Sequence, residues 1–201
     1  MGQLDGVSAI VTGAGRGIGK AIAKVYAREG AAVSLLSRTQ ATVEQVAEEI
    51  RAEGGVARAY ACDVGQRDQV FGVISRAIAD MGTVDVLVNN AQGFGTQSSP
   101  RSSTKYFGVE DTPDDEVEYI FRTGAMASLW GMQAVFPVMK EKRWGKIINF
   151  SSTSGILGTT GNTAYNVTKE AIRSLSRTAA NEWGQWGINA NVISPTLRTD
   201  A

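Results

Sequence analysis

Short apolar runs alternate along the chain with longer segments in which apolar residues recur every three or four positions. The short runs are typical of strands buried on both faces of a parallel sheet, and they predict strands over 7–12, 32–36, 56–61, 84–90, 145–150 and 188–194. The longer segments predict helices over 20–29, 42–53, 66–81, 113–140 and 162–183. Because strand and helix alternate throughout, we expect an α/β fold: a doubly wound, Rossmann-like parallel sheet with helices on both faces.

One stretch does not follow this alternation. Residues 92–112 are rich in Gly, Ser, Thr and Pro, and loops of this length in compact domains are often functional. Phe94, Tyr106 and Phe107 either line a substrate pocket or anchor the loop to the body of the protein. The helix predicted after the loop has a middle, 124–131, that is apolar on too many sides for a solvated helix. That middle is expected to pack against the sheet or against a partner subunit.

The amino-acid composition argues against several classes of function. The 201 residues suit one domain, and 20 Lys+Arg against 20 Asp+Glu leave no net field to attract nucleic acid or an anionic membrane. The absence of His removes Ser-His-Asp and Cys-His catalysis and most zinc or iron sites, so no metal is expected. The single cysteine, Cys62, suits a reducing compartment, and the sequence shows neither a signal peptide nor a membrane-spanning run. We therefore expect a cytoplasmic location.

Glycines alternate with other residues directly after the first predicted strand. The segment from Thr12 to Lys20 reads TGAGRGIGK and stands between a strand and a helix. Glycines let the backbone approach a pyrophosphate, and the free N–H groups and positive dipole end of the helix face it. We expect this loop to bind a dinucleotide through Thr12, Gly13, Gly15, Arg16, Gly17, Ile18 and Gly19. Arg16 is equally well explained as a solvated loop residue.

The end of the second predicted strand carries Ser37 and Arg38. An acidic residue about 20 residues after such glycines would accept hydrogen bonds from the ribose 2′-hydroxyl of NAD, and none is present here. Ser37, Arg38 and Arg16 instead offer donors and positive charge, which suit a 2′-phosphate. We predict that NADP(H) is preferred and that NAD(H) can still bind.

Two further strand ends carry polar candidates. Asp63 and Val64 follow the third predicted strand, where ligands of open α/β sheets gather, and Asp63 can cap the next helix, meet an adenine amino group, or do both. Asn89 and Asn90 end the fourth strand and either touch a ribose or lock buried strand ends by hydrogen bonds, a structural role that suits Asn89 at least as well. We take Asp63, Val64 and Asn90 as cofactor-binding candidates.

Tyr165 and Lys169 lie four residues apart in the last predicted helix, so their side chains share one face. An ammonium group beside a phenol favours the phenolate, which should lower the pKa of the tyrosine from about 10 toward the range of a general acid/base. The spacing alone is weak evidence, because an ordinary pair on a helix surface shares it. Ser152 belongs to a hydroxyl cluster, 151–154, that either binds a polarised oxygen or forms a serine-rich turn.

Taken together, these motifs resemble the short-chain dehydrogenase/reductase family. Thr12-Gly13-x-x-x-Gly17-x-Gly19, Asn89-Asn90-Ala91, Ser152 and Tyr165-x-x-x-Lys169 occur in that family's order and spacing, over essentially the whole chain. The resemblance implies hydride transfer between a nicotinamide and a carbonyl or alcohol carbon. By position it implies that Tyr165 is the general acid/base and that Ser152 hydrogen-bonds the substrate oxygen. It also implies that Lys169 lowers the pKa of Tyr165 and holds the nicotinamide ribose.

The chain departs from the family pattern at several positions. The family usually has Gly where this chain has Gln92, and an Asn that holds a relay water near the position of Gly124. The run after Pro195 is one residue shorter than usual, so no contact with the carboxamide is assigned to Thr199. Family members usually continue beyond the position of Ala201 through a substrate lid and a last strand. We therefore expect residues 1–201 to be a single catalytic domain truncated at its C-terminus.

The sequence thus predicts an NADP(H)-dependent carbonyl reductase or alcohol dehydrogenase acting on a small molecule. The alternative is a nucleotide-binding regulatory or scaffold protein of the same fold with little catalytic activity. Gly124 and the expected truncation favour this alternative, whereas the intact Ser152, Tyr165 and Lys169 argue against it. The apolar faces of the last two long helices, together with the resemblance, predict a homodimer or homotetramer.

Overall fold

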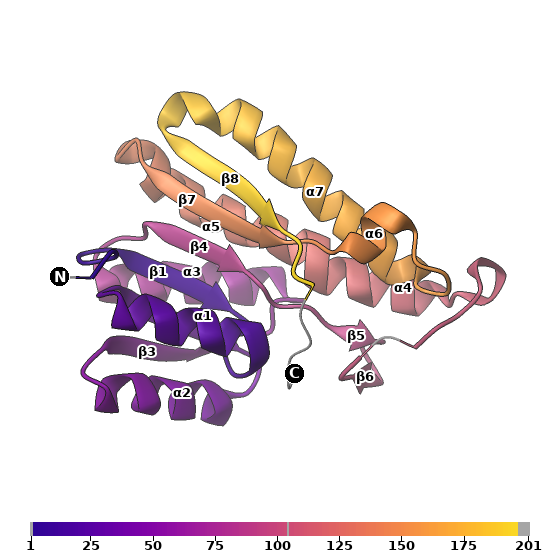
Figure 1. Cartoon of the computed structure of the whole chain (residues 1–201), viewed down its shortest axis with the longest axis horizontal. Coiled ribbons are helices and arrows are strands. Elements are labelled where there is room, and N and C mark those ends of the chain that lie inside the picture. The colour runs from indigo at the N-terminus through magenta and orange to yellow at the C-terminus, as the bar shows by residue number, and fades with distance from the viewer. Residues whose placement is uncertain (1, 104, 197–201) are drawn as a thin grey trace.

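The strands form one parallel sheet in the order β3-β2-β1-β4-β7-β8 (Figure 1). The computed structural model describes residues 2–103 and 105–196. The strands are β1 (Ser8–Thr12), β2 (Ala32–Ser37), β3 (Val56–Ala61), β4 (Val86–Asn89), β7 (Gly145–Phe150) and β8 (Ile188–Ile193). The chain winds outward from β1 in one direction and from β4 in the other. This confirms the predicted doubly wound sheet, and it places a topological switch point between β1 and β4.

Helices cover both faces of the sheet, and each face has its own apolar cluster (Figure 1). Helices α1 (Gly17–Arg28) and α2 (Gln40–Ala52) pack on one face, and α3 (Arg67–Met81), α5 (Ala127–Glu141) and α7 (Thr163–Trp183) pack on the other. Successive strand residues point to opposite faces, so Ile10 joins the α3/α5/α7 cluster and Val11 joins the α1/α2 cluster. This double burial is why the strands read as nearly continuous apolar runs.

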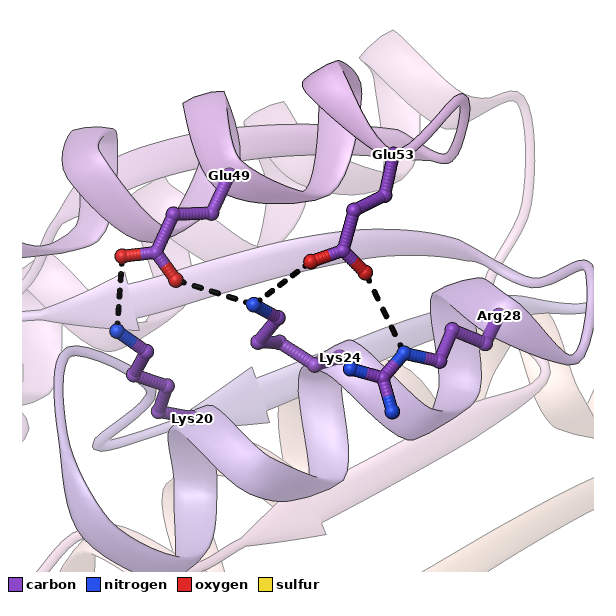
Figure 2. A network of polar contacts seen from close by, with 5 residues as sticks. All are labelled: Lys20, Lys24, Arg28, Glu49 and Glu53. Carbon is purple, nitrogen blue, oxygen red and sulfur yellow. Dashed lines mark hydrogen bonds and ion pairs between the residues drawn. The ribbon is translucent and has the colours of Figure 1, made fainter.

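Ion pairs link α1 to α2 along their solvent-facing sides (Figure 2). The side chains are Lys20, Lys24 and Arg28 of α1 and Glu49 and Glu53 of α2, joined by contacts of 2.9 to 3.3 Å. Such exposed pairs contribute little to stability because water screens them.

The long helix predicted over 113–140 is not uniform. It consists of α4 (Asp114–Phe121), one π-helical turn η2 (Arg122–Met126), and α5. The expectation of an uninterrupted helix was therefore wrong at its centre. A π turn adds one residue to the helical register and rotates the face that follows, and such turns are frequent at functional sites. The apolar residues 124–131 are mostly buried against the sheet and α7. The sheet was one of the two packing partners expected for them.

The loop predicted over 92–112 contains short elements of its own. Strands β5 (Phe94–Gly95) and β6 (Pro100–Arg101) pair as a hairpin, and a 3₁₀ turn, η1 (Val109–Asp111), follows. An ion pair between Arg101 and Glu116 of α4, 2.5 Å long, fixes the hairpin to the body of the protein. The carboxylate side of this pair is buried, with only 4% of the Glu116 side chain exposed. The hairpin is therefore anchored, although its two strands are short.

The remaining elements are a short helix and a 3₁₀ turn. The hydroxyl cluster 151–154 is not a simple turn, because Ser152 caps a short helix, α6 (Thr153–Leu157). A 3₁₀ turn, η3 (Gly184–Trp186), joins α7 to β8. Thr199 and Ala201 lie outside the described residues. Within the described ranges, no helix is both long and apolar enough to cross a membrane.

Candidate active site

A cleft of about 610 Å³ opens where β1, β2, β3 and β4 end. Ligands of open α/β sheets bind at these carboxyl ends, beside the switch point, and the volume is that of a small-molecule site. The predicted site residues that line the cleft are Gly13, Gly15, Arg16, Ile18, Ser37, Arg38, Asp63, Val64, Asn90 and Tyr165. Those that do not line it are Thr12, Gly17, Gly19, Ser152 and Lys169. The fold thus brings together candidates from five separate segments of the chain.

The glycine loop packs too tightly for side chains at its key positions. Gly13 has a φ of 67°, and a Cβ there would lie 2.8 Å from Nδ2 of Asn90. A Cβ on Gly19 would lie 2.4 Å from the Gly13 carbonyl oxygen. The backbone can therefore approach a ligand closely, and the first turn of α1 packs against the loop at Gly19.

The N-terminal end of α1 fits an anionic ligand. Arg16 occupies the cap position without a capping side-chain hydrogen bond, and the first turn contains no acidic residue. The first N–H groups of the helix therefore have no carboxylate of their own to bind, and the helix dipole adds partial positive charge. These properties, together with the close-packed glycines, fit the pyrophosphate of a dinucleotide.

Thr12 and Asn90 hold the glycine loop in place through hydrogen bonds to the backbone. The Thr12 hydroxyl accepts hydrogen bonds from the backbone N–H groups of Asn90 (3.0 Å) and Ala91 (3.1 Å). Nδ2 of Asn90 donates to the carbonyl oxygens of Thr12 (2.9 Å) and Gly13 (3.3 Å). Both side chains thus bond to the backbone, so their observed contribution is to position the loop.

Asn89 holds buried strand ends together by hydrogen bonds, which was one of the two roles considered for it. Its Nδ2 donates to Oδ1 of Asn149 at 2.8 Å, and Nδ2 of Asn149 donates to the Ser176 hydroxyl at 2.8 Å. All three side chains are buried. This chain of amides and a hydroxyl ties β4 to β7 and to α7, which carries Tyr165.

At the end of β2, Arg38 contacts a residue that sequence reasoning missed. Its Nη1 donates to the Tyr119 hydroxyl at 3.0 Å, and Tyr119, from α4, is only 5% exposed. A guanidinium has five N–H donors, so this bond leaves others for an anion. The neighbouring Ser37 hydroxyl donates to the Thr39 carbonyl and lies 3.2 Å from the Thr42 hydroxyl. Arg38 and these hydroxyls form a polar end of the cleft.

Asp63 closes a turn instead of capping the next helix. Its Oδ1 accepts from the Gly65 N–H at 2.9 Å, and its own N–H donates to Oε1 of Gln69. The cap position of α3 is held by Gln66. Asp63 is half-buried and lines the cleft together with Val64. Its other predicted role, beside an adenine, stays a prediction.

Lys169 is buried beside Tyr165. It is 3% exposed, and its Nζ lies 5.3 Å from the centre of the Tyr165 ring and donates to the Phe150 carbonyl oxygen at 2.9 Å. Burial lowers the pKa of Lys169 to about 7, because desolvation disfavours the ammonium form. The Ser151 hydroxyl donates to the Lys169 backbone carbonyl, which fixes this part of α7 to the end of β7.

The expected lowering of the pKa of Tyr165 was wrong for this structure. Burial raises the pKa of Tyr165 above its usual value of 10.0, and a hydrogen bond with Ser152 lowers it in part. Lys169 does not offset the burial because it is itself desolvated, and its pKa near 7 leaves it only partly charged at neutral pH. Ser152, which accepts from the Ser154 N–H at 3.2 Å, therefore supplies the contact that favours the phenolate.

The aromatic residues of the 92–112 loop have different roles. Phe94 lines the cleft and stacks on Tyr165, with ring centres 5.7 Å apart. Phe107 instead anchors the loop, because its N–H donates to the Gly161 carbonyl and it bridges to Asn162. Tyr106 is 67% exposed. In this loop, therefore, Phe94 lines the cleft, whereas Phe107 anchors the loop to the body of the protein.

Several cleft residues were not singled out from the sequence. Tyr119 and Thr123 line the cleft from α4 and η2, and Thr39 and Thr42 line it beside Ser37. The spacing of Tyr119 and Thr123, four residues apart, places them on one helix face, but nothing in the sequence says that this face meets the cleft. In the part of the chain that the structure describes, no group of His, Cys, Asp and Glu side chains could hold a metal ion.

Comparison with known proteins gives consistent matches over nearly the whole chain. The family model described as short chain dehydrogenase matches residues 8–200. The 12alpha-hydroxysteroid dehydrogenase of Clostridium sp. (strain ATCC 29733 / VPI C48-50) is 36% identical, over 99% of this chain and 76% of the relative. Among solved structures, an NAD+-bound xylitol dehydrogenase has a TM-score of 0.88 at 32% identity, covering 96% of this chain and 71% of the other. A metagenomic short-chain oxidoreductase in complex with NADP has a TM-score of 0.85 at 32% identity, covering 96% and 84%.

Proposed function

The chain belongs to the short chain dehydrogenase family of NAD(P)-dependent oxidoreductases, and we propose that within it this protein is an NADP(H)-dependent carbonyl reductase or alcohol dehydrogenase. The observation that carries the proposal is Tyr165, which lines the cleft beside the glycine loop and has Ser152 and Lys169 next to it. Relatives are named dehydrogenases and reductases, which argues against a regulatory or scaffold protein.

A nicotinamide cofactor bound in the cleft would supply the hydride donor or acceptor. The glycine loop and the first N–H groups of α1 would hold its pyrophosphate, and Asp63 and Val64 would face its adenine. Arg38 and Ser37 would hold a 2′-phosphate, because the end of β2 offers positive charge and a hydroxyl but no carboxylate. This composition supports a preference for NADP(H).

Tyr165 acts as the general acid/base in the proposed reaction. Its hydroxyl gives a proton to the carbonyl oxygen during reduction and takes it back from the alcohol during oxidation. Ser152 donates a hydrogen bond to the same oxygen, on which negative charge develops. The raised pKa of Tyr165 keeps the phenol protonated at neutral pH, which suits the reductive direction.

Lys169 supports this proton transfer. Since its pKa lies at about 7, both its protonated and its neutral form are populated near neutral pH, so it can pass a proton to Tyr165 and receive another. Its hydrogen bond to the Phe150 carbonyl holds Nζ beside the tyrosine ring while this happens.

The direct test measures absorbance of the reduced nicotinamide with purified protein and a panel of ketones. We expect turnover with NADPH and a much higher KM for NADH. Binding of NADPH without turnover on any ketone or alcohol would contradict the proposed activity. Comparable KM values for the two cofactors would contradict only the NADP(H) preference.

We also propose that the protein is a homodimer or homotetramer. Trp130 and Phe136 on α5 are only half-buried, and Val167 on α7 is 50% exposed. Apolar side chains on two long helices fit two-fold packing against a second copy. Light scattering at micromolar protein should give at least twice the mass of one chain, and a monomer would contradict this.

A further inference from the structure

The guanidinium of Arg38 is held at the cleft by a tyrosine from a distant part of the chain. Nη1 of Arg38 donates to the Tyr119 hydroxyl at 3.0 Å, across 81 residues of sequence. Arg38 is exposed and, within the described residues, has no carboxylate partner. Because an exposed arginine side chain otherwise samples many rotamers, the place of this guanidinium depends on Tyr119.

The bond to Tyr119 leaves the anion-binding edge of the guanidinium free. A guanidinium has five N–H donors in a planar fork, and the bond at Nη1 uses one of them. The donors on Nε and Nη2 can still bind two oxygens of one phosphate. Since Tyr119 and Arg38 both line the cleft, the bond keeps these donors beside the cleft.

Tyr119 is well placed to hold Arg38 because its own ring is fixed. The residue is 5% exposed, and a Cβ on Gly93 would lie 2.9 Å from Cε1 and 3.1 Å from Cζ of the ring. The backbone of Gly93 therefore packs directly on the phenol. Oγ1 of Thr123 accepts from the Gly93 N–H at 3.1 Å and donates to the Tyr119 carbonyl oxygen at 2.8 Å. The loop after β4 and helix α4 thus hold the ring from two sides.

Two departures from the family pattern strengthen this contact between the loop and the helix. Nε2 of Gln92 donates to the carbonyl oxygen of Ile120, the residue after Tyr119, at 3.1 Å. A Cβ on Gly124 would lie 2.6 Å from Oε1 of Gln92, so the glycine leaves the space that the carboxamide fills. Gln92 and Gly124 together fasten the turn that carries Tyr119 to the loop after β4.

We propose that Tyr119 is a positioning residue for recognition of the cofactor's 2′-phosphate, because its hydroxyl holds the Arg38 guanidinium in place before the cofactor binds. This rests on the proposed preference for NADP(H). Ordering a long side chain at the moment of binding costs affinity, and the bond to Tyr119 removes part of that cost in advance. The effect is confined to ligands that carry the 2′-phosphate.

The test compares two adenosine nucleotides that differ only in this phosphate, adenosine 2′,5′-bisphosphate and adenosine 5′-monophosphate, by calorimetric titration. Tyr119→Phe keeps the buried ring and removes the hydroxyl. We expect its Kd for the bisphosphate to rise about 3- to 10-fold, the range for ordering one long side chain, and its Kd for the monophosphate to stay within about 1.5-fold.

Tyr60→Phe is the matched control. Tyr60 is also 5% exposed, its hydroxyl donates to Oδ2 of Asp80 at 2.8 Å, and it does not line the cleft. This variant should bind both nucleotides as the unmodified protein does. In an Arg38→Ala background, Tyr119→Phe should cause no further loss, because the residue through which Tyr119 acts is absent.

Four results would overturn the inference. They are an unchanged Kd for the bisphosphate in Tyr119→Phe, an equal loss for both nucleotides, an equal loss in Tyr60→Phe, and a full additional loss in the Arg38→Ala background. If the unmodified protein binds both nucleotides equally, the NADP(H) preference fails and the inference fails with it. If the protein reduces no ketone, only the proposed activity fails, because the titrations need no turnover and still decide the role of Tyr119.

Discussion

Replacing Arg38 tests how the protein distinguishes its cofactors. In the structure its exposed guanidinium is held at the cleft by the Tyr119 hydroxyl, 3.0 Å away, and the end of β2 carries no carboxylate. Arg38→Ala removes the positive charge and the donors proposed to hold a 2′-phosphate. NADH has no 2′-phosphate and should be unaffected.

The size of the effect follows from the bonds that are lost. Hydrogen bonds to a charged group contribute about 1.5 to 3 kcal/mol each, and 1.4 kcal/mol is a factor of about ten. The KM for NADPH should therefore rise about 10- to 100-fold in Arg38→Ala, while the KM for NADH stays within about twofold. Because the site is exposed, this difference should shrink as salt is added.

Initial rates with both cofactors, at low and high salt, provide the measurement. Arg58→Ala, which removes an exposed arginine on β3, is the control and should leave both KM values unchanged. Equal rises for NADPH and NADH would refute the assignment of Arg38 to the 2′-phosphate. Such a result would point to a general role of Arg38 in cleft structure through Tyr119.

The structure gives three further predictions, each checked by urea unfolding. Because burial depresses the pKa of Lys169 to about 7 from an unfolded value of about 10, the unfolded chain binds the extra proton between these pH values. Stability should therefore rise by about 2–3 kcal/mol between pH 7 and pH 9, and an equal rise in Lys169→Met would contradict the assignment. Arg101→Ala leaves the buried Glu116 carboxylate without its partner and should lower the free energy of unfolding by about 2–3 kcal/mol. Arg51→Ala, at the exposed pair with Glu44, should lower it little. Equal losses in the two variants would show that burial of the pair does not matter. Asn149→Ala leaves the side chains of Asn89 and Ser176 without their hydrogen-bond partner and should lower the free energy of unfolding by about 2–4 kcal/mol. A loss no greater than that of the exposed Asn191→Ala would contradict the importance of the buried network.

The fold could be predicted because its signals are local. Strands β3 and β7 have the bounds that were predicted for them, and the glycines after β1 mark the tight turn between β1 and α1. Alternation of strand and helix with right-handed connections favours a parallel sheet, although more than one strand order is compatible with it. The π turn at 122–126 has no comparable signal, since its residues are compatible with an ordinary helix.

The candidate site was harder to predict from the sequence because its contacts join segments that are far apart along the chain. The bond between Arg38 and Tyr119 spans 81 residues, and the packing of Gln92 on Gly124 depends on how the loop after β4 meets η2. Composition around these residues does not encode those contacts. The pKa of Tyr165 shows the same limit, because the spacing to Lys169 predicts stabilisation of the phenolate but not the depth to which both groups are buried.

The central claim is that Tyr165 transfers the proton, and Tyr165→Phe tests it most directly. The substitution removes one hydroxyl and keeps the ring that stacks on Phe94. With a ketone that the unmodified protein reduces, kcat should fall by about 10²- to 10⁴-fold, the usual contribution of a general acid. The dissociation constant for NADPH should stay within about twofold, and Tyr106→Phe at the exposed tyrosine should have no effect. A Tyr165→Phe protein that turns over at a rate near that of the unmodified protein would contradict the account.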